Sequence, residues 1–254
     1  MASQCRLMLD QLQVMVHKDF KLKYNSTALG FLWSVLTPTA QSLVYYFVFK
    51  VVMRFQVENY LLYLLSGIFL WQFFCNTIMM SGGIFASNAG LMKKTAFNRL
   101  LLPVTTLLVE SIHFLLTIPI LLIVMVYSGI IPSWSLLTLP LVLFNLWLFT
   151  FGLSLLYASY NIYLRDLERI VTILLQIWMF LSPIFIPLNA VPEKYRFLFC
   201  CNPMTSLLSS WRAIFFEPAW QGMDLLISFS FGAAMLLVGL LAYRKREPGF
   251  AEMM

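Results

Sequence analysis

Charged residues are scarce in this sequence. Only 11% of its 254 residues are charged and 61% are hydrophobic, whereas a typical soluble domain has about 25% charged residues. Several stretches of about 20 residues are almost free of charge, which is the length that a helix needs to cross the roughly 30 Å hydrocarbon layer of a bilayer. The shortage of charge therefore excludes an ordinary soluble protein and predicts an all-α integral membrane protein.

Cysteine and histidine are few as well, and the usual catalytic motifs are missing. The four cysteines are too scattered for a disulfide framework or a zinc site. The sequence has no G-x-x-x-x-G-K-[ST] phosphate loop, no H-E-x-x-H helix and no acidic cluster of the kind that a membrane glycosyltransferase would use. We therefore expect no catalytic centre, no metal and no cofactor on this chain, so that any ATP and Mg²⁺ would be bound by another polypeptide.

The positive charges are spread along the chain and are not gathered in one patch. The net charge of +6 therefore does not predict nucleic-acid binding. When the chain is divided at its apolar stretches, twelve of the 17 basic residues fall on one side of the membrane. By the positive-inside rule that side is the cytoplasm, and it holds both termini.

Hydropathy predicts one membrane domain, residues 1–254. Residues 4–24 are expected to form an amphipathic helix in the membrane interface, with its lysines toward the lipid head groups. The first span is itself the expected insertion signal, because no cleaved signal peptide is recognisable. Between the last two spans, 187–224 is expected to form two short external helices that rest on the outer interface or dip into it as a re-entrant element. The six predicted spans are 29–53, 60–84, 103–127, 134–160, 170–186 and 225–243.

Glu110 is the most unusual residue of the predicted spans, because it lies about two turns inside the third one. Charged groups at such depth are costly and usually face a polar partner or a cavity. His113 follows three residues later on the same helix face and can hydrogen-bond it. One interpretation is a proton or substrate relay, and the other, which we favour, is a polar clamp between helices.

Polar and aromatic residues are mixed in the first two spans. Such residues can line a passage in which aromatic rings stack on sugar faces and amides bind hydroxyls. Ordinary packing between spans, with aromatic belts at the two interfaces, explains any one of them at least as well. The candidates for lining a passage are Trp33, Tyr45, Tyr46, Phe69, Trp71, Phe73 and Asn76.

The predicted cytoplasmic loop between the second and third spans has the sharpest pattern. Three cations and an exposed aromatic residue lie on a short segment that can form a helix, which suits a contact with a cytoplasmic partner. The aromatic ring would anchor the partner in a groove, and the cations would attract it electrostatically. A simple positive-inside anchor explains the charge equally well. The candidate contact residues are Lys93, Lys94, Thr95, Phe97, Asn98 and Arg99.

Several of these segments together resemble the membrane subunits of type-2 ABC exporters, in the group that exports bacterial polysaccharides such as O-antigen, capsule and teichoic acid. The resemblance spans nearly the whole chain. It rests on the order and spacing of Lys23-Tyr24, Leu29-Gly30-Phe31-Leu32-Trp33, the loop 93–103, Arg165-Asp166-Leu167, Leu181-Ser182-Pro183-Ile184-Phe185, Pro192-Glu193 and Asn202-Pro203.

The resemblance implies a homodimer of six-span subunits in the bacterial inner membrane, paired with two copies of a cytoplasmic ABC ATPase. It implies that 93–99 is the coupling helix, that the first two spans form the channel wall, and that a lipid-linked polysaccharide passes along the dimer axis. Asn98 departs from the family, which often has a Phe-Pro-Arg triplet here, so the end of the coupling helix is less sharply set. The implied gate helices lie within 192–216, with candidate residues Pro192, Glu193, Asn202, Pro203, Trp211 and Arg212.

A stand-alone secondary transporter or channel is the second hypothesis, with Glu110 and His113 as its proton-coupling pair. The neighbouring reading frame distinguishes the two hypotheses, because an adjacent gene for an ATPase with Walker motifs favours the exporter.

Overall fold

The computed structural model describes residues 2–24, 30–92, 97–131, 133–164, 166–216, 222–251 and 253. Within these ranges every regular element is helical, which confirms the all-α class. The helices are α1 (Ala2–Tyr24), α2 (Trp33–Tyr46), α3 (Tyr60–Gly82), α4 (Ile84–Ser87), α5 (Ala89–Met92), α6 (Leu101–Leu115), α7 (Ile118–Tyr127), α8 (Leu139–Asn161), α9 (Leu167–Phe180), α10 (Glu193–Cys200), α11 (Pro203–Phe216) and α12 (Gly222–Arg246). A π-helical turn (Phe47–Val52) and 3-10 turns (Gly30–Leu32, Trp134–Thr138, Leu188–Ala190, Glu247–Ala251) extend or join them.

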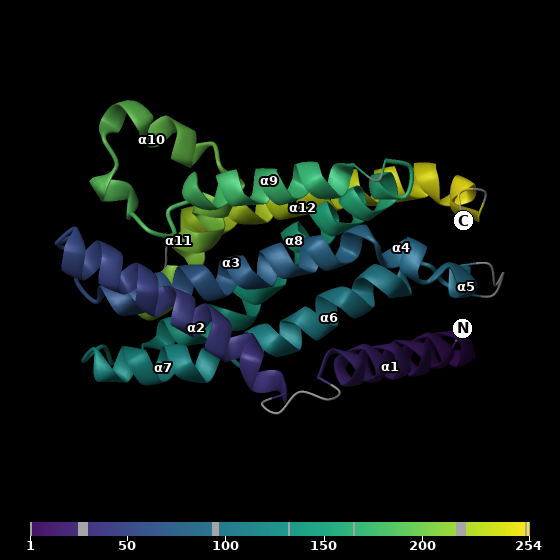
Figure 1. Cartoon of the computed structure of the whole chain (residues 1–254), viewed down its shortest axis with the longest axis horizontal. Helices are drawn as coiled ribbons and strands as arrows, with labels where there is room; N and C mark the ends of the chain where they lie inside the picture. Colours follow the sequence, from purple (N-terminus) through teal and green to yellow (C-terminus); the bar gives the residue numbers. More distant parts are fainter. Residues whose placement is uncertain are drawn as a thin grey trace.

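Five helical segments of the described chain are long and apolar enough to cross a membrane. Figure 1 shows the long helices running along the long axis of the molecule, with α4, α5 and both termini at one end and α10 at the other. The chain is therefore a multi-pass membrane protein. The five segments are Gly30–Val52, Tyr60–Gly82, Leu101–Tyr127, Trp134–Asn161 and Gly222–Phe250.

The fifth predicted span, 170–186, is wrong in its bounds. Helix α9 begins at Leu167 and ends at Phe180. Its length is about 21 Å at 1.5 Å per residue, which is less than the hydrocarbon thickness. Pro183 explains the early end, because proline has no N–H to bond the carbonyl of residue i−4 and its ring clashes with that carbonyl. The chain after Phe180 turns and does not extend the helix.

The third predicted span is one apolar stretch in the sequence but two helices in the structure. Helix α6 ends at Leu115 and α7 begins at Ile118, because Pro119 interrupts the hydrogen-bond ladder. Thr117 closes the gap: its backbone N–H and its hydroxyl donate to the Phe114 carbonyl at 2.9 and 2.6 Å. The two helices still form one membrane-spanning segment.

Helix α3 occupies the centre of the bundle, and α8 and α12 form its most closely packed pair. Most side chains of α3 are buried, and the helix contacts α2, α6, α8, α9 and α11. In the pair formed by α8 and α12, Gly152 of α8 faces Gly239 of α12. A Cβ atom at Gly239 would overlap the carbonyl group of Gly152. Small residues at a crossing allow two helix backbones to approach each other inside a membrane.

Helix α11 is buried in protein, which contradicts the first alternative, a helix that rests on the outer interface. The second alternative, a re-entrant element, stays a prediction. Trp211 is fully buried and Arg212 is 8% exposed, although neighbouring serines such as Ser209 and Ser210 are typical of a polar helix face. The helix packs against α3, α8 and α12. Helix α10, in contrast, exposes Phe197 and Leu198. The two short helices therefore differ in environment: α11 is enclosed by other helices, and α10 is exposed.

Candidate functional site

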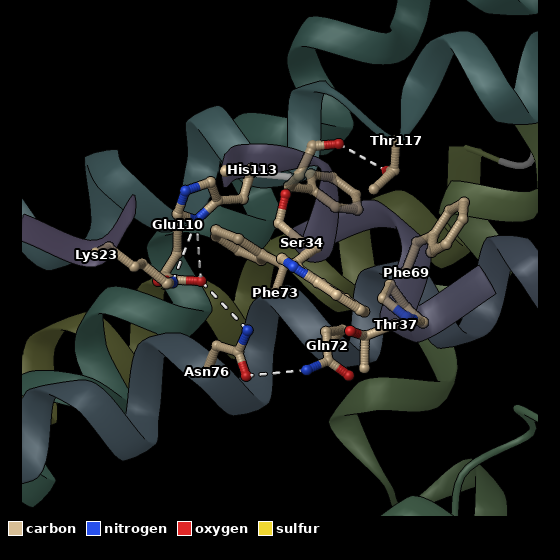
Figure 2. A pocket seen from close by; sticks show the side chains of 14 residues that line it. Lys23, Ser34, Thr37, Phe69, Gln72, Phe73, Asn76, Glu110, His113 and Thr117 are labelled. Carbon is tan, nitrogen blue, oxygen red and sulfur yellow. Dashed lines mark hydrogen bonds and ion pairs between the residues drawn. The ribbon is translucent and has the colours of Figure 1, made fainter. Parts of the chain in front are cut away.

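A cavity of about 290 Å³ lies between the end of α1, the beginning of the first span, the middle of α3 and the end of α6 (Figure 2). Aromatic rings form part of its wall and polar side chains converge on one side, as in many small-molecule sites, which usually hold about 300–1,000 Å³. Its size and chemistry suit one small ring with apolar faces and polar edges. The aromatic lining is Trp33, Phe69, Phe73 and Phe114, and the polar lining includes Lys23, Ser34, Thr37, Gln72, Asn76, Glu110, His113 and Thr117.

The polar side of the cavity is a hydrogen-bond network centred on Glu110. Lys23 Nζ lies 2.6 Å from Glu110 Oε1, and Asn76 Nδ2 donates to Glu110 Oε2 at 3.3 Å. Gln72 Nε2 donates to Asn76 Oδ1 at 3.1 Å, and His113 Nδ1 lies 3.5 Å from Glu110 Oε2. Figure 2 shows this chain of side chains crossing from α1 to α3 and α6. Glu110 is 1% exposed, so its charge depends on these neighbours, Lys23, Asn76 and His113, for compensation.

This geometry favours the clamp over the relay. The network fastens the last turn of α1 to two membrane helices, and the Phe20 ring stacks on the His113 ring at 5.6 Å between centroids. The expectation that the lysines of this helix face the head groups is therefore wrong for Lys23. Burial also raises the pKa of Asp19, on the same stretch of α1, above its ordinary value, and Lys18 offsets part of that rise. No spacing pattern indicates the contact between Lys23 and Glu110, because the two residues lie 87 positions apart.

Arg212 forms a second buried cluster, near the residues that follow α9. Its guanidinium donates to the carbonyl of Pro183, and at 3.2 Å to the carbonyls of Tyr63 and Ile184. Its carbon Cζ lies 3.5 Å from the centre of the Tyr63 ring. Space for it exists because residue 67 is glycine: a Cβ there would lie 2.6 Å from an Arg212 nitrogen.

The Arg212 cluster explains how non-helical backbone is accommodated beside the bundle. Within a bilayer such backbone is tolerated where protein groups satisfy its N–H and C=O groups. Tyr63 Oη also donates to the Pro183 carbonyl at 2.7 Å, and Tyr60 Oη donates to the Phe185 carbonyl at 3.0 Å. Three side chains thus bind the carbonyls of three successive residues. The contribution of the two tyrosines was not predicted, and their sequence context carries no sign of it.

The other gate candidates are distributed around this cluster. Asn202 is buried and caps α11: its Oδ1 accepts from the Met204 N–H at 2.9 Å and from Trp178 Nε1 at 2.7 Å. Trp211 Nε1 donates to the Ser66 carbonyl at 3.0 Å. Pro203 is the first residue of α11, whereas Pro192 and Glu193 begin α10 and are exposed. Their role as a gate stays a prediction.

The described part of the candidate coupling loop is less exposed than expected. Lys93, Lys94 and Thr95 lie outside the described residues. Phe97 is half-buried against a cluster that includes Phe85 and Tyr243, so the expectation of an exposed aromatic anchor is wrong. Asn98 Oδ1 accepts from the Leu100 N–H at 3.1 Å, which caps the beginning of α6 in place of the family's proline. Arg99 is bound within the protein, to the carbonyls of Glu247 at 3.0 Å and Met92 at 3.4 Å.

Among the residues that the structure describes, no group of three or more His, Cys, Asp or Glu side chains is arranged to hold a metal ion.

Comparison with known protein families identifies the family of this chain. Residues 10–216 match the family described as ABC-2 type transporter. The chain belongs to this family.

Relatives of this ABC-2 transporter chain match it over nearly their whole length. It is 36% identical over 248 residues to the O-antigen export system permease protein RfbA of Klebsiella pneumoniae, covering 97% of this chain and 96% of that protein. It is 30% identical to the protein of the same name from Myxococcus xanthus, covering 94% and 93%. It is 24% identical to the polysialic acid transport protein KpsM of Escherichia coli, covering 91% of each.

The channel-lining candidates of this ABC-2 transporter divide into two groups. Trp33, Phe69, Phe73 and Asn76 line the cavity of Figure 2. Tyr45, Tyr46 and Trp71 do not; Tyr45 packs on Phe185, Tyr46 on Tyr60, and Trp71 on Phe74 and Trp178. The period of a helix explains the division, because residues 69, 73 and 76 share one face of α3 and residue 71 lies on another.

Proposed function

We propose that this chain is the membrane subunit of an ATP-driven exporter that moves a lipid-linked polysaccharide out of the cytoplasm. The observation that carries the proposal is the 36% identity over 97% of the chain to a protein named as an O-antigen export permease. The family match and the second named substrate class, polysialic acid, support a negatively charged or neutral glycan cargo of the O-antigen or capsule kind. ATP and Mg²⁺ are bound by a separate ATPase subunit.

The proposed topology has six crossings, of which α9 and the residues that follow it form the fifth. Both termini lie at one end of the molecule (Figure 1), which supports an even number of crossings. Five long segments and α9, which packs beside α3 and α8, supply that number. The excess of basic residues supports a cytoplasmic location for the end with the termini. The bacterial relatives support the inner membrane of a bacterium as its location.

Two copies of the chain and two ATPase subunits form the proposed transporter. The dimer is proposed from the resemblance to the exporter family. Helix α9 exposes an apolar stripe at helical spacing, which is suited to contact with lipid or with a second copy. The exposed stripe consists of Ile170, Ile173, Leu174 and Ile177. The glycan passes between the copies, along walls contributed by the first two spans. The cavity beside Trp33 and Phe73 takes one ring of the cargo, with the amides of Gln72 and Asn76 as hydrogen-bond partners for its hydroxyls.

In this proposal the segment 93–99 contacts the ATPase and receives the movement that ATP hydrolysis produces. We expect the Lys93→Glu/Lys94→Glu double variant to reduce copurification of the ATPase about tenfold or more, because charge reversal turns attraction at an interface into repulsion. The measurement is a pull-down of the ATPase from detergent extracts, normalised to the amount of membrane subunit. Arg244→Glu/Lys245→Glu, which reverses two charges at the same end of the protein, is the matched control. Undiminished copurification of the loop variant would remove the segment from the ATPase contact.

The hypothesis of a stand-alone proton-coupled transporter is tested at Glu110. Lys23 and Asn76 bind different oxygens of the Glu110 carboxylate. Glu110→Gln retains one oxygen, which can accept from one of the two donors, so the clamp is weakened by about 1–3 kcal/mol, the cost of one unsatisfied polar group. We expect export of surface glycan to stay within a few-fold of the wild type. A proton relay loses about 100-fold or more when its acid–base group is removed. Loss on that scale, with normal amounts of protein in the membrane, would favour the second hypothesis.

A further inference from the structure

The C-terminal turn Glu247–Ala251 folds back onto the protein at the end where the candidate coupling loop lies. Phe250 is completely buried. Its ring centre lies 4.8 Å from that of Phe85, which precedes the loop, and 6.0 Å from that of Tyr243 on α12. Met92 and Leu102 belong to the same buried cluster. One aromatic side chain from the end of the chain therefore fills the space between α12 and both ends of the loop.

Hydrogen bonds reinforce this contact from three directions. Arg99 Nη1 donates to the Glu247 carbonyl at 3.0 Å, so the coupling loop is tied directly to the C-terminal turn. Tyr243 Oη donates to Glu247 Oε1 at 2.8 Å, which ties the turn to α12. Tyr163 Oη donates to the Arg246 carbonyl at 3.0 Å, from the link between α8 and α9.

Shape complementarity at Gly249 shows that the turn is closely fitted. A Cβ atom at residue 249 would lie 2.5 Å from the hydroxyl oxygen of Tyr163. The Arg246 guanidinium lies 5.0 Å from the ring centres of both Tyr160 and Tyr163, within the range of a cation–π contact. A buried ring, two hydrogen bonds to Glu247 and a glycine-dependent contact therefore hold the turn against its neighbours, and a third hydrogen bond holds the adjoining end of α12.

The packing of α12 determines where a movement of the loop would be transmitted. Helix α12 is in backbone contact with α8 at Gly152 and Gly239 and cannot slide against it freely. A displacement of the loop reaches α6 directly through the chain. It reaches the α8–α12 pair through Arg99, the C-terminal turn and Phe250. Contiguous packed contacts of this kind can carry energetic coupling between two sites.

We propose that the C-terminal turn is a positioning element of the coupling apparatus, which holds the loop 97–102 against α12 so that ATPase movements are transmitted to the α8–α12 pair as well as to α6. This inference rests on the proposed function, because it presumes that the loop receives the movement. Arg99 acts in it as an internal connector to the Glu247 carbonyl. The ATPase-facing contacts are then left to the residues before Phe97.

The test compares Phe250→Ala with Met253→Ala, a control in the same terminal segment whose side chain is 49% exposed. Phe250→Leu, which restores most of the apolar volume, is the conservative variant. Three quantities are measured for the complete complex of membrane subunit and ATPase: copurification of the two subunits, ATP hydrolysis by the purified complex, and export of surface glycan in cells. Phe250→Ala is expected to lower glycan export about tenfold relative to ATP hydrolysis, within the range of coupling changes caused by mutations in such networks.

In the same experiment copurification is expected to stay near the wild-type level, Phe250→Leu to recover most of the export, and Met253→Ala to behave as the wild type. Equal losses of export, hydrolysis and protein amount would mean that Phe250 only stabilises the fold and would overturn the inference. Unchanged export per ATP hydrolysed would also overturn it. Failure of the unmodified chain to copurify with any ATPase would instead contradict the proposed function, so the two failures are distinguishable.

Discussion

Arg212→Met is expected to destabilise the fold and to lower both the amount of folded protein in the membrane and the export of glycan. Methionine matches much of the apolar volume but donates no hydrogen bonds, so the carbonyls of Tyr63, Pro183 and Ile184 lose the guanidinium. An unsatisfied buried polar group costs about 1–3 kcal/mol. Pro183 retains the Tyr63 hydroxyl, and the Tyr63 carbonyl retains the Ser66 hydroxyl at 2.9 Å. The Ile184 carbonyl is left without the arginine, for a loss of about 1–3 kcal/mol.

The measurement is the yield of monodisperse protein in detergent and the midpoint of its thermal unfolding, beside the amount of surface glycan. Lys194→Met removes an exposed cation from α10 and serves as the control. Arg212→Lys keeps the charge but supplies a compact ammonium group without the planar fork of donors, so we expect an intermediate loss. A normal unfolding midpoint for Arg212→Met would show that the carbonyls find other partners, and the proposed role of the cluster would be wrong.

Gly239→Ala is expected to be the most damaging single-methyl change in the molecule. The added Cβ overlaps backbone atoms of Gly152, which cannot rotate away as a side chain can. Overpacking in a core usually costs about 1–3 kcal/mol, and the rigid neighbour places this site at or above the upper end of that range. Because α8 and α12 also carry the contacts of the C-terminal turn, separating them is expected to reduce export as well as stability.

Gly222→Ala is the matched control, since the same helix there has open space around a Cβ. Gly222 is the first residue of α12, so the helix propensity of an interior position does not apply, and an unfolding midpoint near that of the wild type is expected. The midpoint of Gly239→Ala should fall by several degrees or the protein should fail to accumulate. An unfolding midpoint equal to that of the control would show that the two helices can separate at little cost.

The sequence determined the class of the molecule, because hydropathy depends on composition and spacing and needs no contact information. The scarcity of charge identifies a membrane protein, and four of the six predicted spans, 29–53, 60–84, 134–160 and 225–243, overlap long single helical segments of the structure. The third was expected as one helix although Pro119 carried the signal for a break. The error in the fifth was similarly avoidable, because Pro183 lies inside the predicted range and proline ends helices by a local steric effect.

The sites were predicted less well than the fold. Glu110 was noticed because a charge in an apolar stretch is visible in the sequence, and His113 because it follows at helical spacing. Lys23, which lies closest to Glu110, is on another helix, so no spacing rule reaches it. Arg212 was placed on a polar face because serines surround it in the sequence, but α11 is enclosed by other helices.

Four properties follow from the order of the residues alone: the membrane environment, the approximate number of spans, the side with the positive charge and the resemblance to a family. The contacts between buried groups required the folded molecule: Lys23 with Glu110, Arg212 with the carbonyls after α9, and Phe250 with the cluster around the coupling loop. Periodicity reports only which face of a helix is apolar. It does not report which helix will lie against that face, because this depends on packing between segments far apart in the chain.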